Sequence, residues 1–147
     1  MVPECPASET QCAAVGETMI ERFNPAGVPA PFSNYSHGVV VPAGMRVLHV
    51  SGQVGIGPDG GLPDDPFEQC RNAFANVLAV MAGAGMGPED IVSLTAFVVG
   101  AENLAPYRRA REAAFGAVAP GSTMVYVAAL VDPKMIIEVQ AVAARRI

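Results

Sequence analysis

The chain has 147 residues, of which 51% are hydrophobic and only 16% are charged, and its formal net charge is −5. This length suits one hydrophobic core rather than two. The acidic balance argues against a nucleic-acid partner, because phosphates require a basic surface, and no apolar run approaches the roughly 18 residues that cross a membrane. The hydrophobic share is high for a small monomer and favours an oligomer with buried subunit interfaces.

Residues 1–16 are expected to form a flexible tail that precedes a single domain of residues 17–147. The tail has no basic start followed by an apolar segment, so it does not resemble a signal peptide, and a cytoplasmic location is expected. The three cysteines, Cys5, Cys12 and Cys70, are odd in number and lack metal-ligand spacing. They indicate reduced thiols, with a disulfide or a metal site as the alternative.

The first third of the domain is rich in β-formers and prolines. Residues 18–23 are expected to form the first strand, and residues 24–34, with three prolines, an irregular connector. Residues 37–41 and 46–51 are two further strands. They are joined by Pro42-Ala43-Gly44, which favours a hairpin between them.

A helix with clear boundary signals follows. Asp65 is a suitable N-cap, Pro66 suits the first helical turn, and Glu68 stands three residues after the cap. Gly83 and Gly85 mark its end. Its apolar stripe recurs at helical spacing and comprises Phe67, Cys70, Phe74, Val77, Leu78 and Met81.

The second half of the chain contains three more strands and one more helix. Residues 91–99 are almost free of polar side chains, which predicts a strand buried on both faces. A helix is expected over residues 103–118, and strands over residues 122–129 and 135–143. The resulting order, βββαβαββ, predicts an α+β domain of two layers, with both helices on one face of a mixed sheet. The other face then lacks cover within the chain, and oligomerisation through it is the simplest solution.

Residues 55–60 read Gly-Ile-Gly-Pro-Asp-Gly and match the glycine pattern of a dinucleotide site. Such a site needs its third glycine to open a helix, whereas turn-forming residues follow here. No cofactor is therefore expected. His37 and His49 have no cysteine or carboxylate partners at recognisable spacing, so no metal site is expected and a packed, hydrogen-bonded role is the simpler interpretation.

Two charged features are candidates for function. Arg108, Arg109 and Arg111 form a basic cluster on the second predicted helix. A solvated helix face is the ordinary interpretation, and anion capture at a subunit junction is the alternative. Glu138 lies in the middle of an apolar strand, where a carboxylate is costly to bury unless it is paired or faces a wet cleft. A catalytic role and a structural ion-pair or hydrogen-bond role both stay open for it.

Four short motifs are spread over the domain: Asn34–Gly38, Val50–Gln53, Ala119–Leu130 and Ile136–Ala143. Together they resemble the Rid family, also called the endoribonuclease L-PSP family, over roughly residues 20 to 146. The resemblance implies a homotrimer of chorismate-mutase-like or ferredoxin-like subunits. The sheets would form a central barrel, the helices would lie outside, and three small-ligand clefts would lie between neighbouring subunits.

Enzymes of this family hydrolyse enamines or imines left by pyridoxal-phosphate enzymes, giving a keto acid and ammonia without a metal or cofactor. The resemblance implies that Glu138 orients or activates the attacking water and that Tyr35 lines the cleft. The candidate substrate-binding residues are Ser51, Gly52, Gly121, Thr123 and Arg108.

One position departs from the family pattern. The family's enzymes carry an arginine immediately before the equivalent of Ser122, where it grips the substrate carboxylate, and here that residue is Gly121. The chain thus resembles an arginine-lacking subgroup, whose missing clamp is worth about 1.5–3 kcal/mol. Three functions stay open: hydrolysis of a different, acid-free C–N substrate; non-catalytic binding of a small ligand by a trimer; and a protein-interaction or chaperone-like role.

Overall fold

The computed structural model describes residues 19–147, so the predicted tail, Cys5 and Cys12 lie outside the described residues. The elements follow the order β1 (Glu21–Phe23), β2 (Gly38–Val40), β3 (Met45–Val54), α1 (Pro66–Gly83), β4 (Ile91–Val99), α2 (Leu104–Phe115), β5 (Gly121–Val127) and β6 (Ile137–Arg146). Single 3₁₀ turns precede β4 and α2. The described chain therefore has the predicted βββαβαββ order, with ends displaced by a few residues.

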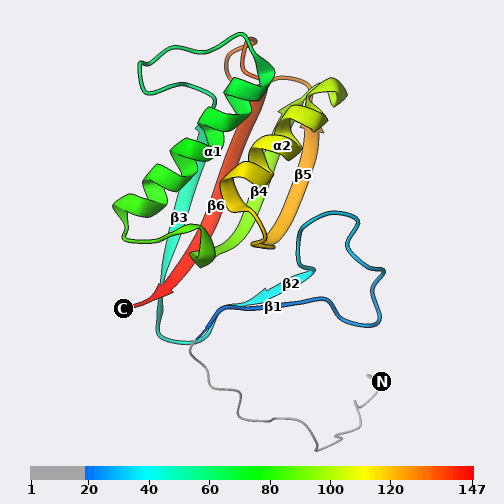
Figure 1. The fold of residues 1–147 in the computed structure, drawn as a ribbon, viewed down its shortest axis with the longest axis vertical. Helices are drawn as coiled ribbons and strands as arrows, with labels where there is room; N and C mark the ends of the chain where they lie inside the picture. The colour runs from blue at the N-terminus through cyan, green and yellow to red at the C-terminus, as the bar shows by residue number, and fades with distance from the viewer. Residues whose placement is uncertain (1–18) are drawn as a thin grey trace, which may run out of the picture.

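The main sheet has four strands in the order β3-β6-β4-β5. β4 and β5 are parallel, and the other two pairings are antiparallel. Figure 1 shows both helices lying across one face of this sheet, with β1 and β2 as a separate ribbon beyond its end. The mixed α+β architecture is thus confirmed, but the strands fall into two sheets rather than one.

The predicted hairpin between residues 37–41 and 46–51 is wrong. A turn does occur there, with Gly44 at φ 80°, yet β2 pairs with β1 and β3 pairs with β6. The side chain of Phe23 explains the β1–β2 pairing, because its ring occupies the space where a Cβ of Gly38 would stand. β3 instead forms a long antiparallel ladder with β6 and is the edge strand of the main sheet.

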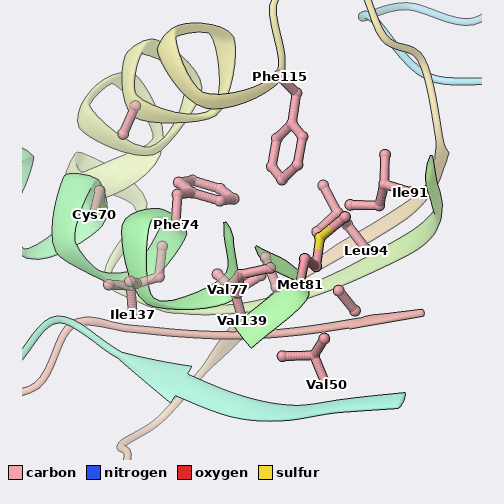
Figure 2. Close-up of a cluster of buried hydrophobic side chains, with 14 of the residues drawn as sticks. Val50, Cys70, Phe74, Val77, Met81, Ile91, Leu94, Phe115, Ile137 and Val139 are labelled. Atoms are coloured by element: carbon pink, nitrogen blue, oxygen red, sulfur yellow. The ribbon is translucent and has the colours of Figure 1, made fainter. Parts of the chain in front are cut away.

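The core lies between the helices and the sheet (Figure 2). The side-chain oxygen of Asp65 accepts a hydrogen bond from the Glu68 backbone N–H at 2.9 Å and caps α1 as predicted. The predicted stripe of α1 faces the sheet, where Phe74 packs edge-on against Phe115 of α2, with ring centroids 5.8 Å apart. The fully buried strand side chains beneath them include Ile91, Leu94, Val98, Ile137 and Val139.

Cys70 belongs to this core and is a free, fully buried cysteine. Desolvation by burial, reinforced by the nearby Asp65 carboxylate, raises the pKa of its thiol to about 12. The thiol is therefore protonated at neutral pH and acts as a small apolar side chain rather than as a nucleophile.

The sheet face opposite the helices has no second layer within the described chain. On β6, alternate residues Ile137, Val139 and Ala141 are buried, whereas Glu138 is half-buried and Gln140 exposed. This matches the predicted two-residue alternation. β4 was expected to be buried on both faces, but its residues on the open side, such as Phe97, are only half-buried because nothing in the described chain covers them.

Candidate functional site

The segment that carries Tyr35 is fastened along the outer edge of β5. The backbone N–H of Ser36 donates to the carbonyl of Pro120 at 3.0 Å, and its hydroxyl donates to the carbonyl of Ala119 at 2.7 Å. Ser36 also forms a parallel bridge with Gly121. The side-chain amide of Asn34 donates to the Gly116 carbonyl at 2.9 Å, just after α2. Two elements distant in sequence thus hold Tyr35 at the start of β5.

The Tyr35 ring is flanked by two other rings. It meets Phe32 edge-on at a centroid distance of 5.6 Å and His37 edge-on at 5.4 Å. A ring nitrogen of His37 is hydrogen-bonded to the Pro29 carbonyl at 2.8 Å, and its backbone N–H donates to the side chain of Asn24. His37 therefore has the packed, hydrogen-bonded role that the sequence favoured, and it fixes the proline-rich connector beside Tyr35.

Tyr35, Gly121 and Thr123 come together around one open cavity of about 360 Å³. Ser93 and Thr95 of β4 complete its polar wall. A Cβ added at Gly121 would meet the Ser93 Cβ at 3.8 Å and no atom closer than 3.6 Å. The position therefore has room for a side chain, and its glycine is not required by packing.

Glu138 and Gly52 form a second group, on the β3–β6 pair. The register shifts between Val50 and Gln53, so that Ser51 and Gly52 form a β-bulge in β3. A Cβ at Gly52 would overlap the Oε1 atom of Glu138, and it would lie 2.8 Å from the Cδ atom. The carboxylate thus rests on the bare Cα of Gly52. Within residues 19–147, Glu138 has neither a hydrogen-bond partner nor an ion-pair partner, and it is half-buried.

The structure does not bring all the candidate residues into one cavity of a single chain. β4 lies between β6, which carries Glu138, and β5, which is fastened to the Tyr35 segment. Two strand spacings separate these strands by roughly 10 Å. Ser51 lines a separate polar cavity of about 250 Å³, together with His49 and Gln140, on the open sheet face. Glu138 therefore does not line the cavity of about 360 Å³ beside Tyr35.

A larger cavity, of about 730 Å³, lies between α2 and residues 32–35. Arg108 and Arg111 of the predicted basic cluster line it, together with Tyr107 and Ser122, which the sequence did not mark as candidate site residues. Helical spacing contains the missing signal, because residues 104, 107, 108, 111 and 115 follow one helix face. Only the fold shows that this face meets β5.

Tyr107 is buried at the base of that cavity. Desolvation by burial raises the pKa of its hydroxyl, while the Arg111 guanidinium and a side-chain hydrogen bond with Ser122 act in the opposite direction. The phenol is therefore neutral at physiological pH.

Residues 19–147 contain no group of three or more His, Cys, Asp or Glu side chains placed to hold a metal ion. Over the same range, no helix has both the length and the apolar character needed to cross a bilayer.

A sequence profile of the family described as endoribonuclease L-PSP matches residues 26–145. The chain is 35% identical over 123 residues to the 2-iminobutanoate/2-iminopropanoate deaminase of Escherichia coli K12. The aligned segment covers 80% of this chain and 92% of that protein. It is 37% identical over 87 residues to the RutC family protein YjgH of the same strain, covering 58% of this chain and 66% of that protein.

Solved structures show the same fold. The Rid-family protein YyfB of Yersinia pestis superposes with a TM-score of 0.72 at 29% identity, covering 84% of this chain and 97% of that one. The YjgF gene product of E. coli gives a TM-score of 0.65 at 32% identity, and the match covers 86% of this chain and 99% of that one. E. coli TdcF, solved with bound serine, gives a TM-score of 0.63 at 28% identity, and the match covers 87% of this chain and 98% of that one. The matched profile, the sequence relatives and these structures agree: the chain belongs to the Rid, or endoribonuclease L-PSP, family.

Proposed function

We propose that this protein hydrolyses an imine, enamine or related C–N substrate to a carbonyl compound and ammonia, without a cofactor. The observation that carries this proposal is the Glu138 carboxylate, half-buried in mid-strand and without an ion-pair or hydrogen-bond partner among the described residues. A structural role would leave such a carboxylate paired. The similarity to 2-iminobutanoate/2-iminopropanoate deaminases supports the reaction class.

The chemistry needs only water and a positioned base. Glu138 accepts a proton from water as the water oxygen bonds to the imine carbon, and the C=N π electrons move to nitrogen. The proton is then delivered to the nitrogen of the tetrahedral intermediate. Glu138 then transfers the proton of the new hydroxyl group to the same nitrogen, which leaves as ammonia as the C–N bond breaks and the C=O bond forms. Tyr35, Thr123 and the backbone of Gly52 are the groups proposed to position the substrate.

A homotrimer is the proposed assembly, with the cleft between subunits. The open sheet face exposes large apolar side chains, including Val47 at 48% and Val125 at 42%, and burying such a patch stabilises an oligomer. Assembly would also let Glu138 of one copy meet Tyr35 of another, which one chain does not achieve.

Light scattering at micromolar concentration is expected to give three times the chain mass. A monomer mass at that concentration would contradict both the proposed homotrimer and the proposed cleft between its subunits.

Gly121 supports a second candidate function, non-catalytic binding of a small ligand by the same trimer. The position lines the Tyr35 cavity but provides no charged group to hold a substrate acid. TdcF, a related structure, was solved with serine bound. Ammonia release from a panel of freshly generated imines, with and without a carboxylate, separates the two functions. Catalysis predicts release above the uncatalysed rate, and binding alone predicts saturable ligand affinity with no release.

Gly52→Ala is expected to lower the rate of imine hydrolysis about tenfold or more, because the new methyl group would displace the Glu138 carboxylate. Stability should change little, since the side chain that must move is flexible at its end. Gly27→Ala is the matched control, because its Cβ would have no neighbour within 4 Å. Parallel rate measurements and thermal melts check this, and an unchanged rate would show that the position of Glu138 does not matter.

A further inference from the structure

The 730 Å³ cavity beside α2 carries a local positive charge in an acidic protein. Its charged lining residues are Arg108, Arg111 and Glu112. The lining therefore has a net charge of +1, whereas the whole chain has a net charge of −5. A positive cavity in a negatively charged protein is a feature that selects anionic ligands.

Neither arginine is fully used by the described protein. Arg108 has no hydrogen-bond or ion-pair partner among residues 19–147, not even Glu112 one helical turn away. Arg111 donates through one terminal nitrogen to the Asn34 carbonyl, but its Nε atom is buried without a hydrogen-bond partner. The other terminal nitrogen of Arg111, Nη1, has no hydrogen-bond partner among residues 19–147, so it can donate to an acceptor bound in the cavity.

Neutral donors and apolar groups complete the cavity. The hydroxyl-bearing side chains of Tyr107 and Ser122 line its wall, and Phe32, which is 86% exposed, also lines it. The apolar lining residues include Leu104, Phe115, Val118 and Met124. The volume falls within the range of about 300–1,000 Å³ that holds ligands of drug-like size. It therefore suits a ligand with an acid group and a sizeable apolar part.

We propose that this cavity is the acid-binding half of the site, and that the natural ligand is an amphipathic organic acid, larger than 2-iminopropanoate, whose carboxylate is held by Arg108 and Arg111. The cavity shares Tyr35, Ser122 and Thr123 with the smaller cavity at Gly121. An acid bound at α2 thus extends its far end toward that smaller cavity. The identity of the ligand as a substrate rests on the proposed hydrolysis, whereas its charge and size do not.

Calorimetry with a matched pair of probes tests this on the full-length protein: 3-phenylpropanoate and its neutral amide, 3-phenylpropanamide. Wild type is expected to bind the acid about tenfold or more tightly than the amide, since charge-assisted hydrogen bonds exceed neutral ones by about that factor. Arg108→Gln should bring the ratio close to one. Glu112→Gln should raise it, because it removes the only carboxylate among the described lining residues.

Arg109→Gln is the control, because it removes one positive charge just as Arg108→Gln does. The Arg109 guanidinium lies over the Phe67 ring, 4.4 Å from its centroid, and does not line the cavity, so this variant should leave the ratio unchanged. The proposal is overturned if wild type binds acid and amide equally, if neither probe binds at millimolar concentration, or if folded Arg108→Gln keeps the wild-type ratio. Acid binding without ammonia release would refute only the hydrolase function, and ammonia release without acid preference would refute only the acid subsite.

Discussion

Glu138→Gln is expected to lower kcat for imine hydrolysis by about 10²- to 10⁴-fold, the usual contribution of a positioned general base. The amide has nearly the same shape as the carboxylate but cannot accept the proton of the attacking water. Stability should be almost unchanged, because Glu138 is half-buried and forms no ion pair or hydrogen bond with the described chain. Ammonia release and a thermal melt measure the two quantities.

Glu21→Gln, on exposed β1, is a suitable control for the loss of one negative charge. It should keep the wild-type rate. A Glu138→Gln variant that stays within threefold of wild type would show that another group activates the water, and the function proposed from this carboxylate would fail.

Gly121→Arg is expected to raise the affinity for pyruvate by about 10- to 150-fold, the worth of a bidentate carboxylate clamp. A Cβ fits at this position with ordinary contacts, and the guanidinium would enter the cavity lined by Tyr35 and Thr123. Glu138 lies on the same sheet face and attracts the new charge, which lowers the gain. Wild type should correspondingly hydrolyse 2-iminopropanoate poorly, since a small acid lacks a cation at this end of the site.

Gly83→Arg adds the same charge at the end of α1, where its Cβ has open space and lies away from the cavity. It should leave pyruvate affinity unchanged. If a folded, trimeric Gly121→Arg variant gains no affinity for pyruvate in calorimetry, the cavity differs from a carboxylate site by more than this residue, and ligand binding without catalysis becomes the better account.

The proposed acid subsite on α2 explains why the chain can have glycine at position 121. An acid that reaches from Arg108 past Ser122 does not need a second cation at the start of β5. Glycine there leaves room for the uncharged end of a longer substrate. The two cavities together then favour a larger acid over the small imino acids named for the sequence relatives.

Local physical chemistry, readable from the sequence, determined the elements and their faces. The Asp65 cap and the stripe ending at Met81 define α1 because capping and helical periodicity act within one or two turns. The alternation around Glu138 fixed which side of β6 is buried because side chains of a strand alternate strictly.

Only the tertiary structure decided the features that depend on non-local pairing. β2 joins β1 rather than β3, with the Phe23 ring packed on Gly38, and β3 pairs with β6 alone. The bulge that seats Glu138 on Gly52 comes from that same β3–β6 ladder, and the cavity at Arg108 exists because Ser36 holds Tyr35 against β5. Contacts between residues far apart in the sequence, 83 positions for Ser36 and Ala119, leave no periodic signal. The sequence therefore supplied the candidate groups, and the fold decided which of them meet.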